Sequence, residues 1–169
     1  DDPLLLADAM DFVSGADLVT IKVHGDTSYF KKFERMRRAI DANHVCTLLD
    51  CTDESVTASY RGMFSRPDED YVRCLAYMVL GGDDNFKSLV LWSIRTFDGL
   101  DLEVPDPVHP PAQGLYYPGR ESIDIDSYVG SLPGDRPNIG IFFYQKQWLT
   151  GNTHHIDALI REIEGQGGN

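Results

Sequence analysis

Hydrophobic residues along this chain gather in short apolar runs, separated by longer amphipathic stretches. The runs at residues 18–23 (LVTIKV) and 45–49 (VCTLL) are rich in branched apolar side chains, which predicts two strands. Residues 138–144 (NIGIFFY) form a third run, whose length and composition are typical of a strand buried on both faces.

The third run leads into a helical pattern near the end of the chain. After a connection over residues 145–151, apolar side chains recur at helical spacing, at Ile156, Leu159, Ile160 and Ile163. Asn152 or Thr153 can serve as the N-cap of this helix. The last part of the chain therefore predicts a strand, a turn and a helix, which is the beginning of a crossover unit between parallel strands.

Helical patterns over residues 3–13 and 27–40 lie before and after the first strand. Because helices and strands alternate with short turns, the pattern predicts an α/β fold. We expect a parallel, flavodoxin-like or Rossmann-like sheet with helices packed against it.

The middle of the chain departs from this alternation. Three helical patterns follow one another over residues 55–64, 67–80 and 84–97, with no apolar run of strand type between them. Their expected buried positions are Val72, Leu75, Ala76 and Val79, then Phe86, Leu89 or Val90, Ile94 and Phe97. This predicts a helical insertion, or a cap over the end of the sheet.

A proline-rich connection with little regular structure follows over residues 102–118, and a short helix over residues 123–132. These patterns suggest four regions, namely a first part of the α/β domain (1–52), a helical insertion (53–99), the proline-rich connection with its short helix (100–136), and a strand–helix unit that continues the α/β region (137–169).

Composition narrows the classes of function. The chain has 169 residues, 42% of them hydrophobic, and a formal net charge of −12. An acidic surface repels phosphates and anionic lipids, so we expect no nucleic acid partner. No run of about 18 apolar residues or secretory signal is visible, so we expect no membrane span. The three cysteines, at Cys46, Cys51 and Cys74, form no disulfide framework or zinc motif, which suggests a cytoplasmic protein. Cys46 and Cys51 lie at the two ends of a predicted strand, so we expect them to be core thiols.

Three places carry candidate binding residues, each with a plainer interpretation. The turn His24–Gly25–Asp26 ends a strand, where ligands bind in open α/β sheets, but it also suits a tight turn. Gly151, Asn152 and Thr153 precede a helix, whose amides can bind an anion or merely be capped. Tyr116 and Tyr117 suit either core packing or a platform for a flat ligand.

No nucleophile, base and orienting group occur at interpretable spacing, so we expect no catalytic residue in this chain. The adjacent residues His154 and His155 point about 100° apart on a helix and are more typical of a solvated pair than of metal ligands. We therefore expect no metal site.

Several motifs resemble the large subunit of cobaltochelatase, which belongs with the large subunit of magnesium chelatase. That family carries a G-I-Y-H-P segment, a strand of the type G-[IV]-L-F-Y, and a G-N-T turn into V-D-A-L-I. The matching stretches here are GLYYPG at residues 114–119 and RPNIGIFFYQKQWLTGNTHHIDALIREIEGQG at residues 136–167. Residues 18–41 resemble the family's strand, turn and helix, and residues 82–89 resemble its G-[GP]-x-N-x-x-x-L pattern.

Two positions depart from the family pattern. Tyr117 stands where the family has a histidine, so no role of that histidine carries over. Asp26 stands where the family's turn has a second glycine.

The resemblance implies an N-terminal segment of a much longer subunit, which binds a corrin precursor or a porphyrin. Such a complex inserts cobalt, in cobalamin biosynthesis, or magnesium at the expense of ATP, together with an ATPase subunit and an accessory subunit. The expected partners are these subunits, the tetrapyrrole and the remainder of the chain's own subunit. This segment would support the macrocycle site, bind no cofactor itself and be inactive alone.

Two alternatives stay open. One is a free-standing flavodoxin-like module for a nucleotide or a small anion, although HGDT is a poor phosphate loop. The other is an interaction domain whose proline-rich and aromatic stretch docks on the rest of its own subunit. Within the family, magnesium also remains an alternative to cobalt.

Overall fold

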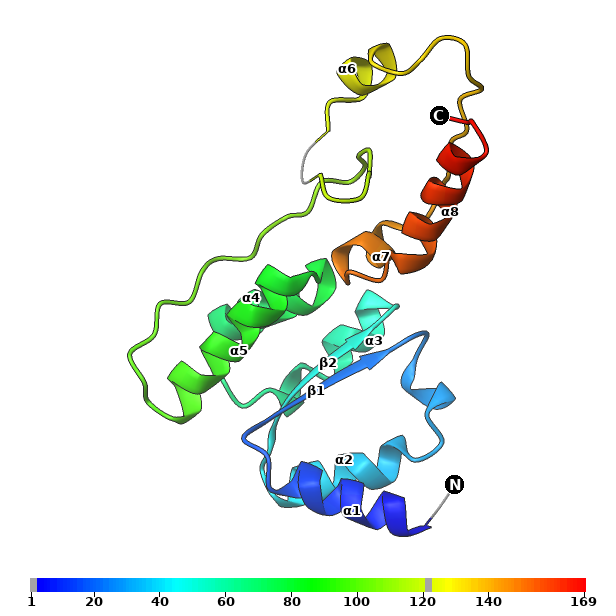
Figure 1. Cartoon of the computed structure of the whole chain (residues 1–169). Coiled ribbons are helices and arrows are strands. Elements are labelled where there is room, and N and C mark those ends of the chain that lie inside the picture. Colours follow the sequence, from blue (N-terminus) through cyan, green and yellow to red (C-terminus); the bar gives the residue numbers. More distant parts are fainter. Residues whose placement is uncertain (1–2, 121–122) are drawn as a thin grey trace. The chain divides into compact units, whose positions relative to one another are not determined.

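The computed structural model describes residues 3–120 and 123–169, and the contacts divide the chain into two units (Figure 1). The first unit comprises the residues up to 80 together with 84–108, and the second comprises 81–83 together with 109–169. The elements up to residue 97 are α1 (Pro3–Ser14), β1 (Leu18–Val23), η1 (Thr27–Tyr29), α2 (Phe33–Ala42), β2 (Cys46–Cys51), α3 (Glu54–Ser59), η2 (Arg61–Met63), α4 (Asp68–Leu80) and α5 (Asp83–Phe97).

The sheet of the first unit has two parallel strands, in register from Leu18 opposite Cys46 to Val23 opposite Cys51. This confirms the two N-terminal strand predictions and their parallel direction. Helices lie on both sides of the pair, with α1 and α2 on one side and α4 and α5 on the other (Figure 1). The first unit is thus a mixed α/β structure, with a sheet smaller than a complete flavodoxin-like or Rossmann-like one.

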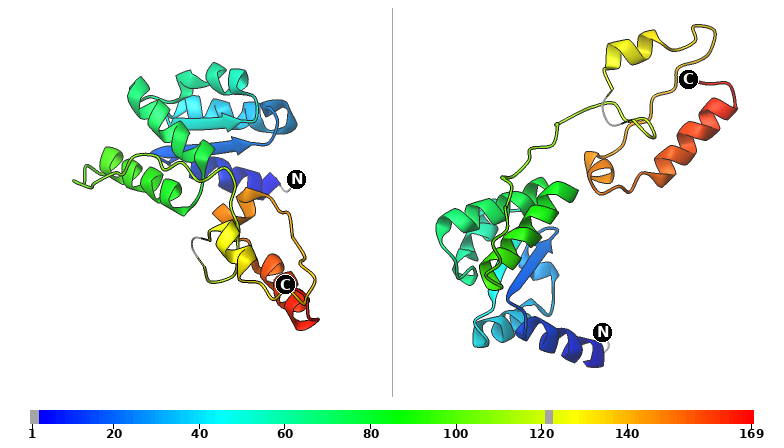
Figure 2. Two further views of the ribbon diagram at one scale, coloured as in Figure 1. Left: turned by 90° about the horizontal axis from the view of Figure 1, so that it is seen from above. Right: turned by 60° about the vertical axis from the view of Figure 1, so that its left-hand side comes forward.

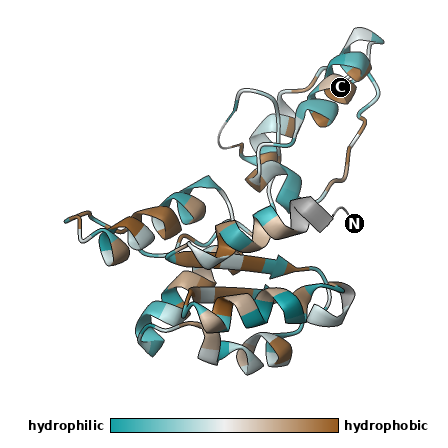
Figure 3. Cartoon of the chain, turned by 90° about the horizontal axis from the view of Figure 1, so that it is seen from below, coloured by the Kyte–Doolittle hydropathy of each residue, from teal (hydrophilic) through white to brown (hydrophobic). Residues whose placement is uncertain are grey.

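The strand β2 is buried along its whole length and separates two apolar clusters. Leu48 packs with Tyr77 and Trp92 of α4 and α5, whereas its neighbour Leu49 packs with Ile40 of α2. Successive side chains of a strand point to opposite faces, so one apolar strand serves both clusters. The strands are accordingly among the most hydrophobic parts in Figure 3.

The expected buried faces of α4 and α5 are wrong in part. Val72, Val79 and Val90 are exposed, at 65%, 58% and 55%, and Phe86 is 43% exposed. Leu89 is buried as expected, and the other residues inside are Cys74, Tyr77 and Met78 of α4, and Asn85, Ser88 and Trp92 of α5.

Polar anchors account for the choice of face. The Trp92 indole N–H donates to Asp70 Oδ1 at 3.0 Å, and the Tyr77 hydroxyl donates to the Pro105 carbonyl. Large aromatic side chains can be buried when their polar ends find such partners. A stripe of valines offers no comparable anchor, and a helical pattern by itself does not distinguish the two faces.

The proline-rich connection has no regular structure as far as residue 115, as predicted. It is held to α5 by Asn85, whose side-chain amide bonds both the carbonyl and the N–H of Val108, at 2.8 and 2.9 Å. Arg73 adds an ion pair to Asp106 at 2.9 Å. Extended chain lacking internal hydrogen bonds is thus fixed by side chains of the helices it crosses.

The second unit contains α6 (Ile125–Gly130), α7 (Gln145–Leu149) and α8 (His154–Gly165), joined by irregular segments (Figure 2). The predicted strand at 138–144 is wrong, because these residues form no strand, and Phe142 and Tyr144 are 102% and 83% exposed. A strand exists only when its backbone groups have a partner strand, and none pairs with this run within the described residues.

Two further details of this region differ from expectation. Part of the expected connection at 145–151 is the short helix α7. In α8 only Ile156 of the apolar stripe is fully buried, and Leu159 is 50% exposed. Within the described part of the chain, no helix is both long and apolar enough to cross a bilayer.

Candidate functional site

The turn after β1 links the ends of both strands of the sheet. Gly25 has a φ of 99°, a left-handed conformation that suits glycine. Its N–H donates to Thr52 Oγ1 at 3.0 Å, and its carbonyl accepts from the Thr52 N–H at 3.2 Å. His24 is exposed at this carboxyl edge of the sheet and lies in the first unit.

Two carboxylates occupy the amides at this edge. Asp26 accepts from the Ser28 N–H at 2.7 Å, and bonds with Ser28 hold the pKa of Asp26 below its usual value. Asp53 caps α3, and hydrogen bonds from the Ser55 hydroxyl and from the Val56 and Ser55 amides lower its pKa. Ionised carboxylates that already hold the free N–H groups make this edge unfavourable for an anion.

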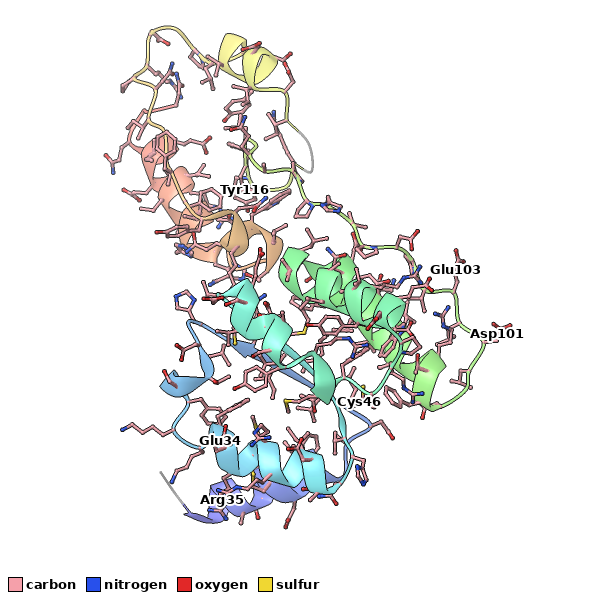
Figure 4. The ribbon with its side chains drawn as sticks, turned by 180° about the vertical axis from the view of Figure 1, so that it is seen from behind. Glu34, Arg35, Cys46, Asp101, Glu103 and Tyr116 are labelled. Atoms are coloured by element: carbon pink, nitrogen blue, oxygen red, sulfur yellow. The ribbon has the colours of Figure 1, made fainter. Side chains whose placement is uncertain are left out.

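Tyr116, labelled in Figure 4, and Thr153 are far apart in the sequence but are hydrogen-bonded to each other in the second unit. The Tyr116 hydroxyl donates to Asp157 Oδ1 at 2.6 Å and lies 3.0 Å from Thr153 Oγ1. Its ring packs edge-on against Phe143, with 5.7 Å between centroids. The bond to Asp157 raises the pKa of Tyr116, so its hydroxyl stays protonated and acts as a donor.

Tyr117 lies at the other end of α8. Its hydroxyl donates to Glu164 Oε1 at 2.8 Å, which raises the pKa of Tyr117. The Arg120 guanidinium lies over the rings of Tyr117 and Tyr128, at 5.2 and 5.6 Å from their centroids. The two adjacent tyrosines therefore brace α8 at its two ends, through hydrogen bonds to acidic side chains.

The turn before α8 is exposed to solvent, although its first N–H groups bond back to α7. Gly151 has a φ of 64° and, like Asn152, is exposed, while the Asn152 N–H donates to the Gln147 carbonyl at 2.8 Å. Thr153 occupies the N-cap position, but its side chain makes no capping bond and faces Tyr116 instead. Thr153 is thus confirmed as the N-cap residue, but its side chain does not cap the helix.

An open hollow of about 570 Å³ lies between the irregular segment before α7 and one side of α8. Its walls are mostly apolar and aromatic, formed by Ile141, Phe142, Phe143, Tyr144, Gln147, His155, Ile156 and Leu159. His155 Nε2 lies 3.3 Å from Gln147 Nε2, which places two polar side chains together in this apolar wall. Such a surface suits a large, flat, mostly apolar ligand with polar groups at its rim.

Sequence reasoning did not single out Asp157, Phe143 or Gln147. The spacing of Thr153 and Asp157 on one helix face was the available signal, because residues four apart are neighbours on a helix. Tyr116 and Asp157 are 41 residues apart in the sequence, so no local pattern predicts their contact.

The cysteines and acidic residues offer no metal centre in the described ranges. No group of three or more His, Cys, Asp or Glu side chains there could hold an ion. Cys46, Cys51 and Cys74 are free and buried, which confirms Cys46 and Cys51 as core thiols. Burial raises the pKa values of Cys51 and Cys74, which makes these thiols poor nucleophiles.

Comparisons with known proteins agree on one family. The family model described as CobN/Magnesium Chelatase matches residues 75–169. The aerobic cobaltochelatase subunit CobN of a Sinorhizobium species is 24% identical over 162 residues, which are 90% of this chain and 12% of that protein. A magnesium-chelatase subunit of Rhodobacter capsulatus is 28% identical over 105 residues, 56% of this chain and 8% of that protein.

The fold is also similar to a solved structure, the catalytic subunit of cobaltochelatase from Mycobacterium tuberculosis. The TM-score is 0.64 at 23% identity, over 100% of this chain and 13% of that one. The chain therefore spans about an eighth of the length of the relatives that it matches along most of its own length.

Proposed function

The chain belongs to the CobN/magnesium chelatase family, and from this membership we propose that it is a segment of the tetrapyrrole-binding large subunit of an ATP-dependent metal chelatase. In this proposal the whole complex inserts cobalt into a corrin precursor, in cobalamin biosynthesis, and cobalt is its substrate. The observation that carries the proposal is the family match over residues 75–169, which contains the whole of α8 and the hollow beside it.

The proposed role of the segment is to support the macrocycle, while the chemistry belongs to other parts of the complex. The apolar and aromatic walls of the hollow, with Gln147 and His155 among them, fit one face or edge of a flat macrocycle. Gly151 and Asn152 form the exposed turn that leads into α8, and the Asn152 side-chain amide can bond the carboxylate or amide groups of a tetrapyrrole rim. Tyr116 and Tyr117 hold α8 in place through their hydrogen bonds to Asp157 and Glu164.

The proposed partners are the rest of the same subunit, an ATPase subunit and an accessory subunit. We further propose that ATP is bound by the ATPase subunit and that this segment holds no cofactor. His24 and Gly25 lie at the sheet edge of the first unit. The capped, acidic surroundings of that edge argue against the alternative of a small-anion or nucleotide module.

We also propose that the two strands are part of a larger, flavodoxin-like parallel sheet in the full-length subunit. Strand β1 is only partly buried, while β2 is buried throughout. Parallel sheets are normally covered on both faces and extended by further strands. Additional strands beside β1 would complete its burial.

Macrocycle titration of the full-length large subunit tests the proposed function. A corrin and a porphyrin are each added to the wild-type subunit and to the His155→Ala and Asn152→Ala variants, and binding is followed by absorbance. We expect each variant to weaken binding by about tenfold, which corresponds to one lost polar contact. Glu162→Ala, on an exposed position of the same helix, serves as the matched control and should bind like the wild type.

Two results would contradict the proposal. Failure of the wild-type subunit to bind either macrocycle would remove the function itself. Wild-type affinity in both variants would be compatible with the proposed function but would show that this surface is not part of the macrocycle-binding site. Addition of cobalt and magnesium in separate titrations then distinguishes the two branches of the family.

A further inference from the structure

We propose that residues 139–144 are the open edge of a parallel sheet, and that the stretch which follows Asn169 in the full-length subunit pairs with them as the next strand. The inference rests on the proposed placement of this chain within a longer large subunit. It adds a specific interaction surface, a specific occupant and a register.

The first rung of this pairing is present in the structure. The Asn169 N–H donates to the Pro137 carbonyl at 2.8 Å, and the Asn169 carbonyl accepts from the Ile139 N–H at 2.9 Å. Asn169 thus uses both its N–H and its carbonyl to bond Pro137 and Ile139, the two residues on either side of Asn138. This is the hydrogen-bond pattern of parallel strands, with Asn169 opposite Asn138.

The side chain of Asn169 fixes this rung in place. Its amide nitrogen donates to the Pro133 carbonyl at 2.8 Å, and it lies 2.9 Å from Asn138 Oδ1 and 3.4 Å from the Arg136 carbonyl. These hydrogen bonds hold Asn169 against residues 133–138. The chain therefore leaves the rung in a defined direction, along residues 139–144.

The exit from α8 is built around Gly168. Gly167 takes a φ of 86°, and the Gly168 N–H donates to the Ile163 carbonyl at 2.9 Å, as in a glycine-ended helix. A Cβ on Gly168 would lie 2.8 Å from Ile163 Cγ2 and 3.3 Å from Ile139 Cδ1, so no larger residue fits there. The close approach brings the end of α8 directly onto the first residue of the open edge.

Residues 140–144 are ready to accept a strand. Ile141 and Phe143 are half-buried while Phe142 and Tyr144 are exposed, which is the two-residue alternation of a strand. None of the N–H groups of residues 140–144 has a backbone partner within the described ranges. The 24 residues from 145 to 168, with α7 and α8, provide a helical crossover of the length that parallel neighbours require.

The first rung sets the register of all the others. With Asn169 opposite Asn138, the N–H groups of Ile141 and Phe143 point towards the new strand and donate to the carbonyls of the second and fourth residues after Asn169. The N–H groups of Gly140 and Phe142 point to the other side. We therefore expect the amides of Ile141 and Phe143 to be hydrogen-bonded to the new strand, and those of Gly140 and Phe142 not to be.

Amide hydrogen exchange of the full-length subunit, resolved to single residues by fragmentation, tests the pairing. We expect the amides of Ile141 and Phe143 to exchange at least tenfold more slowly than their intrinsic rates. In Gly168→Ala this protection should fall at least fivefold, because the exit from α8 is displaced. Gly140→Ala is the matched control, since a Cβ there meets nothing within 4 Å, and it should keep the protection.

Several outcomes would overturn the proposal. Unprotected amides at Ile141 and Phe143 in the wild-type subunit would overturn it, whatever the variants show. Unchanged protection of these amides in a Gly168→Ala variant whose α5 stays folded would also overturn it. Protection that increases with protein concentration would assign the edge to a second copy of the chain. No macrocycle is present in this experiment, so its failure is distinct from a failure of the proposed function.

Discussion

Replacing Tyr116 by phenylalanine removes one oxygen atom and tests how α8 is held. The hydroxyl donates to Asp157 at 2.6 Å and lies 3.0 Å from Thr153 Oγ1; Asp157 is in the first turn of α8, and Thr153 is its N-cap residue. A hydrogen bond to a charged group contributes about 1.5–3 kcal/mol when it is well buried. Tyr116 is only half-buried, so we expect the Tyr116→Phe variant to lose about 1 kcal/mol.

Amide exchange in α8 is the assay, because local opening of this helix is the quantity that changes. A loss of about 1 kcal/mol corresponds to roughly fivefold faster exchange in the first two turns of α8. Tyr144→Phe is the matched control, since Tyr144 is 83% exposed and its hydroxyl has no partner among the described residues. Equal exchange rates in α8 of the Tyr116→Phe and Tyr144→Phe variants would refute the bracing role.

The same bond gives a pH dependence of known sign. Asp157 raises the pKa of Tyr116 in the folded chain above its unfolded value. The folded state therefore binds the phenolic proton more tightly than the unfolded state. The stabilisation that this hydrogen bond contributes is complete below about pH 10, the ordinary tyrosine pKa. It is lost as pH rises through the raised pKa, so the difference between wild type and Tyr116→Phe should shrink in alkaline solution. Tyrosinate absorbance and exchange rates measured together check this.

Three further predictions concern the first unit. Asn85→Ala should destabilise it by about 2–3 kcal/mol in urea denaturation, because it removes both side-chain hydrogen bonds to the backbone of Val108. Ser93→Ala is the control and should change little, because among the described residues the Ser93 hydroxyl bonds only the Val90 carbonyl of its own helix. Equal midpoints of the two variants would contradict the anchoring role. Cys74 should react with a thiol reagent only as the unit unfolds, since it is buried and its pKa is raised; fast labelling of the folded chain would disprove this. Asp53→Ala should lower the melting temperature at neutral pH, and the deficit should vanish as pH falls through the lowered pKa of Asp53.

The sequence predicted the local elements well where a pattern had only one structural solution. The branched apolar runs became β1 and β2 in parallel register, because such side chains fit a buried, pleated backbone. The proline-rich stretch stayed irregular, because proline has no N–H for a helix or ladder. The motifs at residues 114–119 and 136–167 also identified the family that the comparisons show.

The candidate site was predictable as a set of residues but not as an arrangement. Tyr116 and Thr153 were both singled out, and the structure joins them. Their common partner Asp157 escaped notice, because it lies 41 residues from Tyr116. The candidates His24 and Gly25 lie in the other unit, and their role stays a prediction.

The sequence by itself determined which stretches are strand-like, which are helical and where the backbone must turn, because these depend on side-chain shape and spacing over a few residues. The tertiary structure decided which face of α4 and α5 is inside, since Trp92 and Tyr77 are buried where distant partners accept their hydrogen bonds. It also decided the fate of residues 138–144. Their apolar pattern is that of a strand, but a strand needs a hydrogen-bonded partner strand, and none pairs with these residues within the described ranges.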